Sequence, residues 1–168
     1  MDSEGHGSVK FDLINPEGSN AGEVMIDNVL IKSRPNLIDY LRSGWCINTS
    51  FAIDFTASNG DIEDANSLHH QDSTGRVQNQ YEQAIMGVGS IIQPYGYEDQ
   101  YAVFGFGGVP RHLGADKISH CFNLSGSQDP KIRGLANVYS AYKTSILNTK
   151  LAGPTYFQYI LKALLSYV

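Results

Sequence analysis

The chain has 168 residues, 42% of them hydrophobic and 11% aromatic, and this length and composition are typical of one packed domain rather than a disordered segment. A formal net charge of −5 argues against sequence-independent nucleic-acid binding, which requires a basic surface, and predicts no strong attraction to anionic lipid. Two cysteines, Cys46 and Cys121, are too few for a disulfide framework, and their apolar surroundings predict buried thiols.

The N-terminal part of the chain contains few signals of packed structure. Residues 1–21 are rich in glycine, serine and charge, which predicts a poorly ordered segment. Residues 22–32 predict a single strand, which needs a sheet to join. Residues 33–45, with Pro35 and then NLIDYL, predict a linker and a short helix. The sequence lacks an apolar stretch of membrane-span length and the apolar core of a signal peptide, so we expect a cytoplasmic protein.

Residues 47–60, INTSFAIDFTASNG, carry the strongest local pattern. They begin as an apolar run of β-branched and aromatic residues, which predicts a buried strand. Asp54, Thr56 and Ser58 then follow at alternate positions, at the end of that strand where open α/β sheets bind ligands. One acid and two hydroxyls suit a hard cation such as Mg²⁺. Alternatively, Asp54 and Ser58 cap the turn through local hydrogen bonds to the backbone.

The remaining sequence alternates between strand and helix patterns. Asn79 with Glu82 three residues later predicts the start of a helix. The face expected to be buried comprises Tyr81, Ala84, Ile85, Val88, Ile91 and Ile92. Further on, we expect a strand at residues 101–106, an antiparallel partner at residues 117–124, a helix at residues 131–147 and a last helix after Thr155. The last helix is expected to bury Phe157, Ile160, Leu161 and Leu164.

Neither zinc binding nor catalysis finds support in these patterns. His69, His70 and Asp72 share one loop, and His112, Asp116 and His120 are spaced by four residues. A four-residue spacing brings ligands together only on a helix, and zinc requires a tetrahedral set, so we expect surface histidines in loops. The sequence has no Ser-His-Asp order with a nucleophile-elbow motif, no catalytic Cys-His arrangement and no phosphate-binding loop, so we expect a protein that is not an enzyme.

Four longer segments indicate a family. IDFTASNGD, SLHH at residues 67–70, GFGG at residues 105–108 and AGPTYF at residues 152–157 occur in an order and spacing that resemble the copine family. The resemblance runs from about residue 22 to the last residue. Copines carry a von Willebrand factor A-type domain after two C2 domains. The resemblance implies an α/β fold at residues 46–168, the first half only of a Rossmann-like, doubly wound sheet, with residues 22–32 as the last strand of a C2 domain.

The resemblance also implies a metal ion-dependent adhesion site. Carried over by position, Thr56 and Ser58 would bind the metal through their hydroxyls, Asp54 would bind it directly or through water, and Thr155 would supply the second loop. The aspartate of a third loop is expected beyond residue 168, so Mg²⁺, or else Mn²⁺ or Ca²⁺, would be held weakly. Thr155 has an alternative role, because Thr155 and Gln158 have the spacing of a capping box.

The function implied is a metal-dependent module that binds proteins, in which a partner's Asp or Glu carboxylate completes the cation's coordination. Phospholipid binding, and residence at the inner face of the plasma membrane, would come from the family's C2 domains. Two alternatives are a scaffold half-domain that a partner completes without metal, and the copine-like domain of a RING-type ubiquitin ligase. The apolar strand at residues 47–55 is expected to be an exposed edge, which predicts self-association or pairing with residues 22–32.

Overall fold

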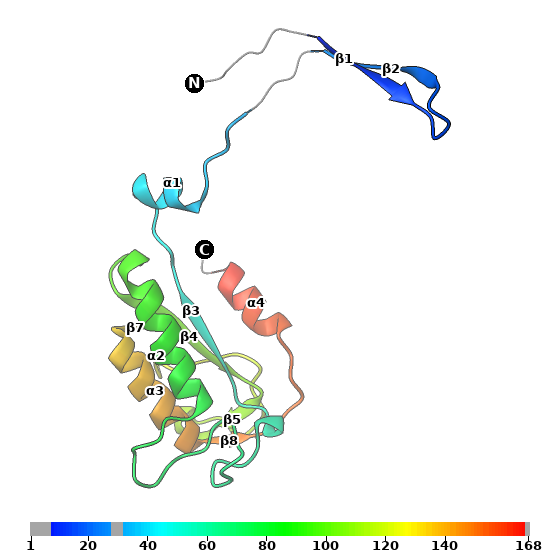
Figure 1. Cartoon of the computed structure of the whole chain (residues 1–168). Coiled ribbons are helices and arrows are strands. Elements are labelled where there is room, and N and C mark those ends of the chain that lie inside the picture. The colour runs from blue at the N-terminus through cyan, green and yellow to red at the C-terminus, as the bar shows by residue number, and fades with distance from the viewer. Residues whose placement is uncertain (1–7, 28–31, 167–168) are drawn as a thin grey trace. The chain divides into compact units, whose positions relative to one another are not determined.

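The structure is a computed structural model that describes residues 8–27 and 32–166, and the chain forms two compact units that divide after Trp45. The first unit contains an antiparallel hairpin of β1 (Val9–Ile14) and β2 (Asn20–Ile26). It also contains α1 (Leu37–Arg42), which begins at Asn36 with a capping box. Figure 1 shows these elements in blue and cyan.

The hairpin differs from the two sequence predictions that it overlaps. A strand occupies Val9–Ile14, within the segment expected to be poorly ordered, and β2 has this strand as its partner instead of being single. The reason is local: apolar and charged residues alternate in VKFDLI, and the Asn15 side chain closes the turn by accepting the backbone N–H groups of Glu17 and Ser19. Residues 28–31 of the predicted strand lie outside the described residues.

The second unit is built on a mixed sheet. Its parallel pair is β3 (Ser50–Asp54) and β4 (Gln100–Phe106), and β4 also pairs antiparallel with β6 (Phe122–Asn123) and β7 (Lys131–Arg133). A small second sheet joins β5 (Gly108–Pro110) to β8 (Thr149–Leu151). The helices are α2 (Gln80–Ile92), α3 (Leu135–Asn148) and α4 (Gln158–Leu165), with short 3₁₀ turns η1 (Ala57–Asn59), η2 (Gln93–Tyr95) and η3 (Arg111–Leu113).

Helices cover both faces of this sheet, with α2 and α3 on one side and α4 on the other (Figure 1). The larger core lies under α2 and α3, where Ile53, Phe55 and Val103 pack against Ile85 and Tyr142. The smaller core consists of Ala102, Phe104, Phe106 and Ile160, the last from α4. The predicted α/β class is therefore confirmed, and the arrangement matches a partial von Willebrand factor A-type domain.

The buried face of α2 matches the predicted face only in part, since Ile85 is buried and Tyr81 packs against the core as expected. Glu82, Ile85 and Gly89 are buried, whereas Val88 and Ile91 are 51% and 70% exposed. Gly89 explains the rotation, because a Cβ atom there would lie 2.4 Å from the Leu135 side chain of α3. The missing side chain lets the two helices approach closely, and a count of apolar residues does not detect this.

The later elements also depart from prediction at their ends. Residues 131–133 were expected to begin a helix but form β7, and Gly134, with φ of 82°, separates that strand from α3. Phe157 and Leu161, expected to be buried by α4, are 61% and 58% exposed. Cys46 is exposed rather than buried. Among the described residues, none of the helices combines the length and apolar character needed to cross a bilayer.

Strand β3 is shorter than the predicted strand at residues 47–55, and β4 is its only neighbour within the sheet as described. Its other edge is therefore the place where a further strand could pair. Self-association through this edge stays a prediction. Sedimentation of the purified chain would test it, and a monomer at all concentrations would contradict it.

Candidate metal site

The candidate site lies in the turn that follows β3. The carboxylate Oδ1 of Asp54 accepts the backbone N–H of Thr56 at 2.8 Å, and this bond folds the chain back at the end of the strand. The hydroxyl oxygens of Thr56 and Ser58 lie 2.9 Å apart. Thr56 is buried and Ser58 is exposed, so the hydroxyl pair lies at the boundary between the core and the surface. The structure thus brings three of the four predicted residues together.

The spacing of the two hydroxyls fits a magnesium ion. Octahedral Mg²⁺ holds oxygen ligands at about 2.1 Å, which places neighbouring ligand oxygens about 3.0 Å apart. The Thr56 and Ser58 hydroxyls share a hydrogen bond, and its 2.9 Å length already holds the two oxygens at about that separation. Across the described residues, His, Cys, Asp and Glu form no group of three or more with metal-binding geometry. A cation here would therefore depend on hydroxyl oxygens, with Asp54 supplying the charge.

Ala152, three residues before Thr155, lies at the same end of the sheet as the other three residues. Ala152 forms a parallel bridge with Thr56, and its backbone N–H donates to the Phe55 carbonyl at 3.2 Å. Thr155 follows three residues later, exposed to solvent, and no hydrogen bond is found between it and the turn after β3. The alternative role of Thr155 is wrong, because α4 has Phe157 as its N-cap and no side-chain capping bond.

Gly107, in the GFGG segment, allows the chain after β4 to pass against the turn. Its φ is 77°, and a Cβ atom would lie 2.3 Å from the Thr56 methyl group. A larger residue would push Thr56 away from Ser58 or force the backbone out of a region that favours glycine. The GFGG segment therefore shapes the site without supplying a ligand.

Asn59 and Tyr81 hold the turn on its buried side, a role that was not predicted from the sequence. Asn59 Nδ2 donates to the Thr56 carbonyl at 3.0 Å, and the Tyr81 hydroxyl donates to Asn59 Oδ1 at 3.0 Å. Burial, with a smaller effect from the negative charge of Asp54, raises the pKa of Tyr81 to about 12, so its hydroxyl stays protonated. The available signals were the Asn59-Gly60 pair, interpreted only as a turn, and a tyrosine at the start of a helix.

His69 is fully buried, so the prediction of a surface histidine is wrong at this position. Its Nε2 lies 2.7 Å from the Asp54 carbonyl and its Nδ1 lies 2.9 Å from the Tyr142 hydroxyl. Because a carbonyl only accepts, Nε2 carries the proton and Nδ1 accepts from Tyr142. Burial lowers the pKa of His69, and the Asp54 carbonyl and carboxylate oppose that shift only in part. A neutral imidazole therefore joins the end of β3 to α3.

The network continues to the beginning of α2. Asn79 Nδ2 donates to the Tyr142 hydroxyl at 3.0 Å, while Asn79 forms the predicted capping box with Glu82. Glu82 is buried and pairs with Lys143 of α3 at 2.7 Å. The candidate turn, α2 and α3 are thus connected by consecutive hydrogen bonds, which makes this end of the unit a single polar assembly.

Comparison with known proteins identifies the family to which this arrangement belongs. The copine family model matches residues 67–168. The chain belongs to the copine family. It is 35% identical over 159 residues to Protein BONZAI 1 of Arabidopsis thaliana, an alignment that covers 92% of this chain and 27% of that protein. It is 37% identical over 139 residues to Copine-A of Dictyostelium discoideum, covering 82% of this chain and 22% of that protein. The copine chain spans about a quarter of the length of these relatives.

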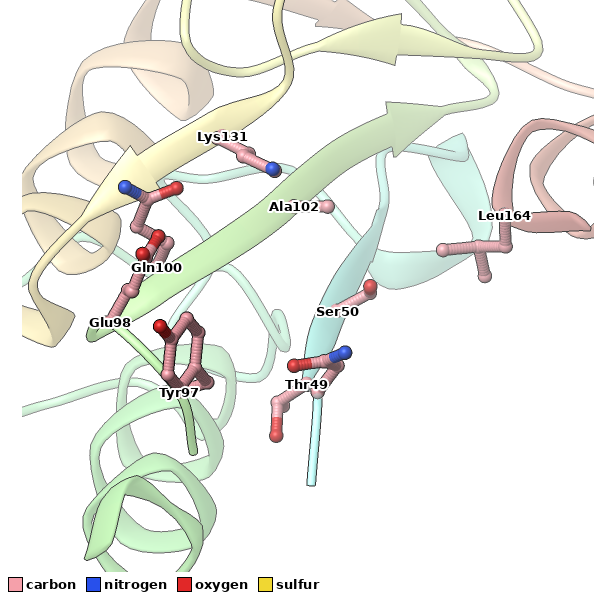
Figure 2. Close-up of a pocket in the computed structure, with 9 residues that line it drawn as sticks. Thr49, Ser50, Tyr97, Glu98, Gln100, Ala102, Lys131 and Leu164 are labelled. Carbon is pink, nitrogen blue, oxygen red and sulfur yellow. The ribbon is translucent and has the colours of Figure 1, made fainter. Parts of the chain in front are cut away.

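Two hollows lie at opposite ends of the β3–β4 pair in this copine chain. One, of about 560 Å³, borders the candidate turn and is lined by Ala57, residues 60–63 and residues 149–151. The other, of about 340 Å³, lies at the amino ends of the strands, where Thr49, Ser50, Gln100 and Lys131 line it (Figure 2). Only the first hollow is next to the hydroxyl pair.

Proposed function

We propose that this copine chain is a non-catalytic protein-interaction module whose Asp54 turn binds a divalent cation and presents it to an acidic side chain of a partner. The observation that supports this most directly is the 2.9 Å spacing of the Thr56 and Ser58 hydroxyl oxygens beside the Asp54 carboxylate. Mg²⁺ is the cation that we propose, and Mn²⁺ and Ca²⁺ are the other hard cations considered. Thr155, three residues after the bridge between Ala152 and Thr56, is the proposed ligand from the second loop.

The charge of the site favours an acidic partner. Asp54 is the one carboxylate among the four proposed ligands, so a divalent cation would keep excess positive charge. Weak cation binding by the chain alone follows from this, as does attraction to a carboxylate that the partner supplies. The cation, when bound, supplies an open coordination position with positive charge. The 560 Å³ hollow beside Ala57 and Gly60 gives a partner segment room to approach.

The family resemblance supports a cytoplasmic protein that is peripheral at the inner face of the plasma membrane. We propose that phospholipid binding in copines belongs to their C2 domains. The net charge of −5 gives this chain no general attraction to anionic headgroups. We propose no contact with nucleic acid, for the same electrostatic reason.

A metal-free scaffold is the competing function, and one observation favours it. The Asp54 carboxylate accepts the Thr56 N–H, so it stabilises the turn even when no metal is bound. Asp54→Asn separates the two functions, because the amide retains an accepting oxygen but loses the charge. Asp64→Asn is the matched control, since Asp64 also accepts a backbone N–H two residues on, at 2.9 Å, and is exposed.

Calorimetric titration with MgCl₂ provides the test. The chain and Asp64→Asn should bind one Mg²⁺ with a dissociation constant of about 1 mM, and Asp54→Asn should bind at least about tenfold more weakly. Circular dichroism should show that all three remain folded. Absence of binding in the unmodified chain, or equal binding in Asp54→Asn, would reject the metal-dependent function and leave the scaffold.

A further inference from the structure

The ring of Tyr81 is held in one orientation where α2 begins. It stacks on the buried His69 ring with centroids 4.0 Å apart and planes 17° apart. His69 is itself fixed, because its Nε2–H donates to the Asp54 carbonyl and its Nδ1 accepts from the Tyr142 hydroxyl. The Tyr81 hydroxyl therefore has a defined position, and Asn59 Oδ1 lies 3.0 Å from it.

The side chain of Asn59 is buried and its orientation follows from its neighbours. Its Nδ2 lies 3.0 Å from the Thr56 carbonyl, 3.3 Å from the Asp54 carbonyl and 3.4 Å from the Thr56 hydroxyl. The amide nitrogen is thus directed at the residues that carry the proposed ligands. The amide oxygen must then accept from elsewhere, and Tyr81 is the donor that it meets.

We infer that Tyr81 is a positioning residue of the cation turn: its hydroxyl orients Asn59, which holds the backbone of Thr56 so that the Thr56 and Ser58 hydroxyls keep the spacing of octahedral ligands. This inference rests on the proposed function. Tyr81 belongs to α2 and Asn59 to η1, 22 residues apart in the chain, so the helix acts on the turn through one hydrogen bond. Loss of that bond leaves a buried amide oxygen without a donor, and Asn59 is then free to rotate away from Thr56.

Tyr81→Phe removes this bond and retains the stacked ring. The variant should bind Mg²⁺ about tenfold more weakly in calorimetric titration, as is usual when a group that orients a metal ligand is lost. Tyr101→Phe is the matched control, because the Tyr101 hydroxyl also donates to a side-chain oxygen, Asp99 Oδ1 at 3.1 Å, at the amino end of β4. Tyr101→Phe should leave Mg²⁺ affinity unchanged. Equal affinity in Tyr81→Phe and the unmodified chain would overturn the inference.

A double-mutant cycle distinguishes positioning through Asn59 from a general loss of stability. If Tyr81 acts through Asn59, Tyr81→Phe should weaken Mg²⁺ binding about tenfold in the unmodified chain and not at all in Asn59→Ala. Independent tenfold losses would overturn the inference. If Asn59→Ala does not fold, the comparison of Tyr81→Phe with Tyr101→Phe decides alone. Failure of the unmodified chain to bind Mg²⁺ would reject the proposed function and this inference together, whereas binding that Tyr81→Phe leaves unchanged would reject the inference only.

Discussion

The two ends of the β3–β4 pair differ in the side chains that surround them and in how those side chains are held. At the carboxyl end, the turn after Asp54 is held by buried polar groups, among them Asn59 and His69, whose hydrogen bonds come from α2 and α3. At the amino end, the strands open into a hollow lined by polar side chains, such as Ser50 and Lys131, together with the apolar Ala102 and Leu164 (Figure 2). The turn at the carboxyl end is therefore held in place by buried hydrogen bonds.

Backbone conformation differs between the two ends as well. Glu98 and Asp99, just before β4, have φ of 63° and 49°, a left-handed region that glutamate disfavours. At Asp99 the unfavourable backbone conformation is offset by hydrogen bonds. The Asp99 carboxylate accepts from Gln93 and Tyr101, and its carbonyl accepts the Gly134 N–H at 2.8 Å. The comparison favours the carboxyl end as the ligand site, because ordered oxygens stand there at the ends of parallel strands, where open α/β sheets bind ligands.

The largest expected effect concerns the support of the carboxyl end. His69→Ala should lower the free energy of unfolding by about 3 kcal/mol, because it opens a cavity and leaves the Asp54 carbonyl and the Tyr142 hydroxyl without this partner. Urea denaturation measures the change. His112→Ala, at an exposed histidine, should change stability by less than about 0.5 kcal/mol. Equal losses of stability in the two variants would contradict the conclusion that buried hydrogen bonds hold the carboxyl end in place.

A smaller effect is expected from relieving strain at the amino end. Glu98→Asn should raise the free energy of unfolding by about 0.5 kcal/mol, since asparagine tolerates the left-handed conformation better than glutamate. Glu98→Gln removes the charge but keeps the conformational preference, so it should leave stability unchanged. A gain in Glu98→Gln as large as that in Glu98→Asn would show that charge, and not backbone strain, is the cause.

Sequence patterns predicted the elements whose signals are local. The capping box at Asn79 marked the start of α2, and the apolar runs located β3 and β4, because hydrogen-bonding side chains and periodicity act within a few residues. Three of the candidate ligands, Asp54, Thr56 and Ser58, are separated by only two residues each. Local folding of the turn therefore brings them together, and no contact between distant segments is needed to predict it. The family resemblance, not spacing, pointed to Thr155.

Contacts between distant segments account for the rest. Burial of His69 depends on Tyr142, 73 residues away, and the role of Asn59 depends on Tyr81. The buried face of α2 depends on the fit of Leu135 against Gly89, which no periodicity within α2 encodes. Each of these features is decided by packing between elements, and single-sequence reasoning registers only the preferences within them.

We propose that the carboxyl end of the β3–β4 pair binds a divalent cation and that the amino end does not. The most direct measurement is a titration of the ¹⁵N-labelled chain with MgCl₂, followed by amide resonances at both ends. We expect saturable shifts at residues 56–59 and at Thr155, with none at residues 98–100. Shifts confined to residues 98–100, or equally small and non-saturating at both ends, would contradict the claim.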